Sequence, residues 1–403
     1  MRRGAALLLL VGFSSPLMAA KSLSVEECEQ LLAKLQGKSD ARAAQEVGEV
    51  ELTERVSLDR LAKWEKEIPG AKSHEALIRL ADSAAFLKSP PSDLLRIEPP
   101  DSDTQERMLQ LASDYVKGAM TRLPNLSATR QTTHFEDVPS KEQPNSGEWR
   151  LNPMAIVPVR AEARPLRSTG SISSTVTYRE GKEMHDAPAQ SSQESQAPSG
   201  LTTSGEFGPI LAVVIGDAIR GQVAWEHWEQ GSGDPVAVLR YAVPEDQSNF
   251  RVDIPIGTKF EEVRPAYHGE IAIDPATGSI LRLSVVADVT GSDPPIQAAI
   301  LVEYAPVPIG DRTCLCPVHG AAYSKAPVME SPQDSQHAVL MRTQLNDVEF
   351  TNYRLFGSQA RIVVGGKGQT GPTAPAAEAG SPSSQADGNP STPDAASAPQ
   401  QPR

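Results

Sequence analysis

The chain has 403 residues, a formal net charge of −13 at pH 7 and only three cysteines. This acidic balance argues against a general nucleic-acid binder, because binding to phosphates relies on basic surface. Three cysteines are too few for a disulfide scaffold in a chain of this length. The length leaves room for about two domains.

The first twenty residues have the three parts of a secretory signal peptide. Arg2 and Arg3 give a positive start, residues 5–13 form a short apolar core, and small alanines precede Lys21. The apolar core is too short to span a bilayer, and no later stretch is long and apolar enough to do so. We therefore expect residues 1–20 to be removed on export, giving a periplasmic or secreted bacterial envelope protein without a transmembrane anchor.

Residues 21–123 carry apolar side chains at helical spacing, in segments that end at prolines and glycines. Ser24 and Glu27 predict a capping box at the first helix, and Ser102 and Gln105 predict another at the longest helix. Each apolar stripe is narrow, so these helices must pack on one another or on the next domain. The sequence predicts a helical N-terminal region.

After Pro124 the apolar pattern changes to a period of two, which is typical of strands. The clearest hairpin joins residues 270–273 to 279–287 through a turn in which Pro275 fixes φ and Gly278 tolerates a positive φ. A second strand pair is expected between residues 236–243 and 250–256. Further strands are expected at residues 127–135, 153–160, 171–180, 221–230, 296–305, 312–319, 346–353 and 359–364. Their close spacing predicts an antiparallel sheet rather than βαβ units.

One helix is expected within the sheet region, at about residues 204–219, with Thr203 and Glu206 as a capping box. It is apolar nearly all round, which is typical of a helix buried against a sheet. Residues 186–200 predict a polar surface loop, and residues 365–403 predict a disordered tail because they lack large apolar side chains. The fold class is therefore α+β, with a helical region at 21–123 and a curved antiparallel half-barrel at 124–364.

Three stretches carry a resemblance to known proteins. Residues 123–129 read LPNLSAT, residues 267–278 read YHGEIAIDPATG, and residues 350–356 read FTNYRLF. They resemble a group of uncharacterised exported bacterial proteins over most of residues 24–364, which brings no activity with it. The order of the parts also resembles the LolA-type lipoprotein carriers and lipid-binding proteins. That resemblance implies a half-barrel that wraps around helices and leaves an apolar concave face for a lipid.

Cys314, Cys316 and His319 are the candidate metal ligands. On a strand the two cysteines point to one face, so two thiolates and an imidazole could bind a soft metal. No fourth ligand at a recognisable spacing supports a closed zinc site. Two other readings stay open: ordinary buried cysteines, or a disulfide from either one to Cys28.

Two groups of residues are candidates for contacting a ligand. Leu281, Leu283 and Val285 alternate along the return strand of the hairpin and are expected to share its inner face. Trp225 and His227 are expected to share a face of another strand, with Trp228 on the opposite face. The alternative for both groups is core packing.

No catalytic motif is present in the sequence: there is no Gly-x-Ser-x-Gly elbow, no phosphate-binding glycine loop and no histidine pair at helical metal spacing. We therefore expect no catalytic residues and no cofactor, which disfavours an enzyme. The leading hypothesis is a non-catalytic binder of an apolar or lipidated ligand, with a lipid, a lipoprotein or an envelope protein as partner. A structural or protein-interaction role, and a hydrolase with a site assembled from distant residues, are the alternatives.

Overall fold

The computed structural model describes residues 21–137, 165–185, 200–256, 259–289, 296–327 and 341–355. The predicted signal peptide and tail, the expected strands at 153–160 and 359–364, and residues 186–199 of the polar loop lie outside the described residues. The chain divides into two units, Met1–Gly357 and Ser358–Arg403, and every described residue belongs to the first.

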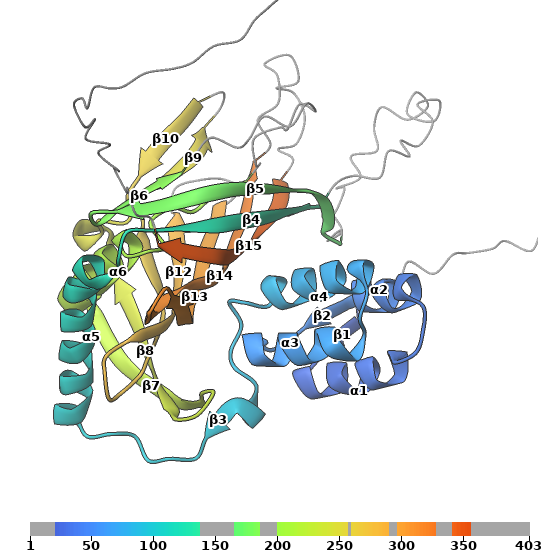
Figure 1. Cartoon of the computed structure of the whole chain (residues 1–403), viewed down its shortest axis with the longest axis horizontal. Coiled ribbons are helices and arrows are strands. Elements are labelled where there is room, and N and C mark those ends of the chain that lie inside the picture. Colours follow the sequence, from blue (N-terminus) through green and yellow to red (C-terminus); the bar gives the residue numbers. More distant parts are fainter. Residues whose placement is uncertain are drawn as a thin grey trace, which may run out of the picture. The chain divides into compact units, whose positions relative to one another are not determined.

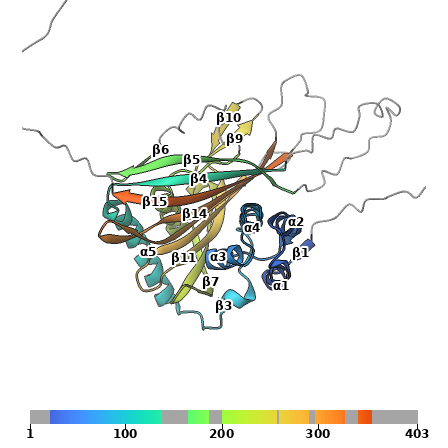
Figure 2. The ribbon, with the colours of Figure 1, turned by 45° about the vertical axis from the view of Figure 1, so that its right-hand side comes forward.

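Eleven strands of the described residues form one curved, open antiparallel sheet (Figures 1 and 2). Their order across the sheet is β3 (Leu94–Leu95), β7 (Gln222–Gln230), β8 (Pro235–Val243), β11 (Ala266–Ile273), β12 (Ile280–Val289), β13 (Ile296–Ile309), β14 (Arg312–Pro327), β15 (Met341–Leu355), β4 (Leu126–Glu136), β5 (Arg167–Arg179) and β6 (Lys182–His185). Most neighbours in this order are also consecutive in the chain, as expected for a sheet built from hairpins. The predicted α+β class with an antiparallel half-barrel is confirmed.

The predicted hairpin is present as β11 and β12. In its turn the Gly278 amide donates to the Asp274 carbonyl at 2.9 Å, and Gly278 has a φ of 73°. The second expected pair is wrong, because β8 pairs with β7 and β11. Instead, β9 (Val252–Ile256) pairs with β10 (Lys259–Val263), a strand that the sequence analysis missed. β9 and β10 are close in sequence, so their pairing closes only a short loop. Closing a short loop costs less conformational entropy than closing a longer one.

Four helices precede the sheet: α1 (Val25–Leu35), α2 (Asp40–Gly48), α3 (Leu58–Glu67) and α4 (Ala71–Ser83). The Ser24–Glu27 capping box at α1 is confirmed. These helices share a core in which Trp64 and Cys28 are fully buried. A short parallel pair, β1 (Lys21–Leu23) with β2 (Val50–Leu52), ties the ends of α1 and α2 together.

The fifth helix, α5 (Ser102–Arg122), does not join this helical core. It packs with α6 (Pro209–Arg220), and its Ala112 and Val116 belong to the core of the sheet.

The capping boxes predicted for α5 and α6 both differ from the structure. Asp101 accepts the amide hydrogen of Thr104 at the start of α5. Helix α6 begins only after Gly208, because Pro209 occupies its first turn and has no amide hydrogen to donate. Two 3₁₀ turns complete the described elements: η1 (Pro91–Asp93) and η3 (Glu245–Gln247).

The two faces of the sheet differ in chemistry. One face, here called the α6 face, packs against α6 through apolar side chains that include Leu239, Ile271 and Val302. The opposite face, here called the charged face, carries Arg282, Glu303, His319 and Asp347 together with the buried Leu301 and Ala321. Among the described residues, no helix is both long and apolar enough to cross a membrane.

Candidate functional site

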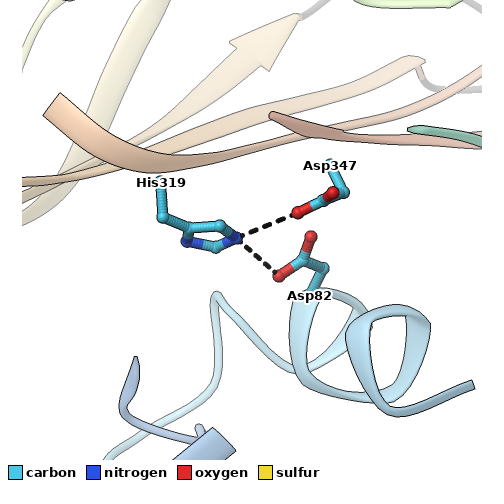
Figure 3. Close-up of side chains that lie close together, drawn as sticks. All are labelled: Asp82, His319 and Asp347. Atoms are coloured by element: carbon cyan, nitrogen blue, oxygen red, sulfur yellow. Dashed lines mark ion pairs between the residues drawn. The ribbon is translucent and has the colours of Figure 1, made fainter. Parts of the chain in front are cut away.

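A buried polar cluster lies where α4 meets the charged face of the sheet (Figure 3). Glu303 on β13 and His319 on β14 are directly paired across the two strands. Asp347 on β15 pairs with Ala321, which places it diagonally from His319. Asp82 reaches the same point from the last turn of α4. Four side chains from distant parts of the sequence therefore meet around one imidazole.

The imidazole of His319 contacts three carboxylates. Its Nδ1 lies 3.0 Å from Oε2 of Glu303, while Nε2 lies 3.2 Å from Oδ1 of Asp82 and 3.3 Å from Oδ1 of Asp347. Neither Nε2 contact has the geometry of a hydrogen bond, and Oδ2 of Asp82 also has no hydrogen-bond partner. Both of these atoms are inaccessible to solvent. The cluster is thus closely packed and not fully satisfied by hydrogen bonds.

Burial controls the ionisation of this cluster. Burial raises the pKa of Asp82 to about 7, because its effect exceeds the opposing attraction of His319. Burial lowers the pKa of His319, but Asp82, Asp347 and Glu303 together outweigh it and raise the pKa well above its usual value. Asp82 also lies at the negative end of the α4 dipole, which disfavours a carboxylate there. The buried carboxylates of this site therefore favour a nearby positive charge.

A second ionic group lies beside the first on the charged face. Glu229 on β7 accepts hydrogen bonds from Arg55, from the Ser89 hydroxyl at 2.6 Å and from Nη1 of Arg282 at 2.8 Å. Arg282 also contacts Glu270 at 3.4 Å. Burial raises the pKa of Glu229, but Arg282 and Arg55 outweigh it and lower that pKa to about 2. This group joins the helical region to the sheet through a fully ionised carboxylate.

The two groups differ in charge balance. In the second group, two arginines face the two carboxylates of Glu229 and Glu270. In the first group, three carboxylates contact a single imidazole. Burial raises the pKa of one of them, Glu303, but the imidazole together with Arg55 and Arg282 outweighs it and lowers that pKa. Burying uncompensated carboxylates is costly. The first group is therefore the place on this face that most favours a bound cation or a proton.

Two grooves border the charged face and meet at Phe86, which follows α4. The first, here called the polar groove, has a volume of about 530 Å³, and the charged side chains of Lys88, Arg240 and Glu270 are part of its lining. The second has a volume of about 540 Å³. Its lining is more apolar and includes Phe86, Val286, Val289, Ile296, Ala299 and Tyr323. The aromatic rings of Phe86 and Tyr323 lie 6.5 Å apart. Both volumes are within the range of small-molecule sites.

The predicted ligand residues on β12 do not line a groove of this kind. Leu283 and Val285 are each 1% exposed and pack beneath α6. Leu281 does not share their face, because it is the extra residue of a β-bulge. The strand register shows the bulge, since Ala272 pairs with Arg282 whereas the next residue, Ile273, pairs with Ile280. Leu281 packs instead with Val238 and Ala272 on the face of Arg282.

The predicted aromatic group is also rearranged by a bulge. Trp225 pairs with Leu239 and His227 with Val238, so Glu226 is the extra residue. Trp225 therefore packs toward the α6 face, while His227 lies on the other face. Trp228 returns to the side of Trp225, with their ring centroids 4.9 Å apart. The expectation that Trp225 and His227 share a face, with Trp228 opposite, is wrong.

The predicted metal ligands are not brought together. Cys314 and Cys316 pack in a core with Phe207 and Phe350, whereas His319 contacts the carboxylates of the charged face. A third bulge, with Val318 as the extra residue, separates them. All three cysteines are free thiols, so the structure has no disulfide to Cys28.

The partners of His319, namely Asp82, Glu303 and Asp347, were not predicted from the sequence. Asp82 lies on the polar side of a helical stripe, and Glu303 and Asp347 follow the ordinary alternation of strands. No short-range spacing marks them, because their proximity depends on strand register and on the docking of α4.

Comparisons of the chain with protein-family models, curated proteins and solved structures found no match. The resemblance to LolA-type proteins therefore stays a prediction, and function has to be argued from the geometry.

Proposed function

We propose that the protein is an exported, non-catalytic binding protein of the cell envelope, and that its ligand carries an acyl chain. The observation that supports this most is the apolar groove of about 540 Å³ beside Phe86 and Tyr323. Burial of apolar area drives capture of an acyl chain, at roughly 25 cal/mol for each Å². The groove replaces the α6 face as the expected site, because α6 and α5 already fill that face.

The polar groove supports a ligand with a polar head group. It adjoins the apolar groove at Phe86 and Val286, which line both. Exposed Lys88 and Arg240 offer donors there, beside the acceptor Glu270. An amphiphile would place its chain against Val286 and Tyr323 and its head group near Arg240. Ligand sites commonly combine apolar walls with a few polar groups in this way.

A protein-interaction role is the second candidate, favoured by the filled α6 face. Because α5 and α6 already cover the apolar face of the sheet, that face needs no small ligand for its stability. A hydrolase has less support, although His319 and its carboxylates converge. The reacting atoms of that cluster are inaccessible to solvent, and a catalytic site must admit its substrate.

A fluorescent fatty-acid titration tests the proposal. The wild-type protein should bind the probe saturably, and Val286→Gln should weaken binding at least about tenfold by placing an amide in the groove. Val223→Gln is the matched control, because Val223 is also half-buried but lines neither groove. Failure of the wild-type protein to bind, or equal binding by Val286→Gln and wild type, contradicts the proposal.

A further inference from the structure

Three donor atoms converge on one buried point between α4 and the sheet. Oδ1 of Asp82, Nε2 of His319 and Oδ1 of Asp347 lie within 4.8 Å of one another. They come from a helix and two neighbouring strands, so each is held by a different element (Figure 3). Imidazole nitrogen and carboxylate oxygen are both common ligands of divalent metals.

The distances fit a small, four-coordinate ion. Metal bonds of about 2.0 to 2.2 Å in a tetrahedron place ligand atoms roughly 3.3 to 3.6 Å apart. Nε2 of His319 lies 3.2 Å from Asp82 and 3.3 Å from Asp347. Two of the three distances between donors therefore match those in a tetrahedral site, and the third is no longer than 4.8 Å.

The tautomer of His319 is set by Glu303. An Nδ1–H that donates to Oε2 of Glu303, at 3.0 Å, leaves the Nε2 lone pair directed toward Asp82 and Asp347. Metal-binding histidines commonly donate their second nitrogen to a carboxylate in this way. Glu303 thus lies where a carboxylate that does not bind the metal itself would orient the metal-binding imidazole.

An unpartnered polar atom gives an independent indication. Asp82 is only 2% exposed, yet its Oδ2 makes no hydrogen bond. A small cavity of about 10 Å³ borders Asp82, Glu303 and His319. Arg55 and several apolar side chains complete its lining, and its volume is at the lower limit for one water molecule. The site thus has an unused ligand atom and room for a fourth ligand.

We propose that Asp82, His319 and Asp347 bind one divalent transition-metal ion of the zinc type, with a water molecule or the second oxygen of Asp82 as fourth ligand. The ion would neutralise the two carboxylates and clamp α4 onto β14 and β15. Its role is structural, since Asp82 and Asp347 are buried and the side chain of His319 is only 12% exposed. This inference does not depend on the acyl-chain groove.

Metal content and binding test the proposal on the full mature chain. Protein stripped with a chelator and dialysed against Zn²⁺ should hold one ion per chain, and its melting temperature should rise by several degrees. Co²⁺ in the same site should give the visible absorption of a tetrahedral ion without thiolate charge-transfer bands. Asp347→Asn should weaken Zn²⁺ binding at least tenfold.

Three further variants separate this site from its rivals. Glu303→Gln leaves all ligands in place and should weaken binding about tenfold to a hundredfold, as expected for an outer partner. Glu262→Gln, whose ion pair with Arg251 is about half exposed, and the double change Cys314→Ser with Cys316→Ser should both keep one ion per chain. A wild-type protein that binds no Zn²⁺ shows that His319 is an imidazolium paired with carboxylates, and overturns the proposal. Binding that survives Asp347→Asn unchanged, or disappears with the cysteines, also overturns it.

Discussion

Arg55 and Glu229, which lie 174 positions apart in the sequence, form an ion pair whose side chains are only 4% and 6% exposed. Arg55 follows β2 of the helical region, and Glu229 lies on β7 of the sheet. Arg282 binds the other oxygen of the same carboxylate at 2.8 Å. This carboxylate therefore couples the docking of the helical region to the folding of the sheet.

Glu229→Gln should destabilise the protein by about 3 kcal/mol, because it leaves two buried guanidinium groups short of a carboxylate. Urea unfolding measures the change. Glu262→Gln is the matched control, since its ion pair with Arg251 is about half exposed. That control should cost under about 1 kcal/mol. Equal losses in the two variants would contradict the assigned role of Glu229.

The stabilisation from Glu229 should depend on pH. Its pKa in the folded protein is about 2, below the ordinary value of 4.5, because Arg282 and Arg55 outweigh the effect of burial. The contribution is therefore complete above the ordinary value, and it disappears as the pH falls from there through about 2. The difference in unfolding free energy between wild type and Glu229→Gln should be constant above about pH 5 and approach zero near pH 2. A constant difference down to pH 2 contradicts this.

Strands, the β11–β12 hairpin and the first helix cap could be predicted from the sequence, because each depends on neighbouring residues. The candidate site could not. Each of its three predicted groups crosses a bulge, with Glu226, Leu281 or Val318 as the extra residue. One extra residue moves every later side chain to the other face. Nothing in the pattern of apolar residues marks these bulges.

Leu283→Ala should cost about 2 to 5 kcal/mol, because Leu283 is 1% exposed in the core beneath α6. Binding of a fatty-acid probe by the folded variant should be unchanged, since Leu283 does not line the apolar groove. Urea midpoints and probe titration measure the two effects. If Leu283→Ala lost little stability but bound the probe more weakly, the ligand site would lie on the α6 face rather than in the apolar groove.

Gly278→Ala should destabilise the β11–β12 turn and the docking of α5 together. Gly278 has a φ of 73°, and an added Cβ would collide with the carbonyl group of Leu111 on α5. The expected cost is about 2 kcal/mol or more. Gly233→Ala is the control, because an added Cβ there meets no atom within 4 Å. It should change the unfolding free energy by less than about 0.5 kcal/mol. Comparable effects of the two changes would contradict close packing of the turn on α5.

Photolabelling tests the central claim, an acyl-chain site on the charged face, most directly. A diazirine-bearing fatty acid is cross-linked to the full mature chain, and the labelled residues are located by peptide mass spectrometry. We expect labels at Phe86, Val286 or Tyr323, removed by competition with an unlabelled fatty acid. Competable labels confined to residues beneath α6, or labelling that competition does not reduce, would contradict the account.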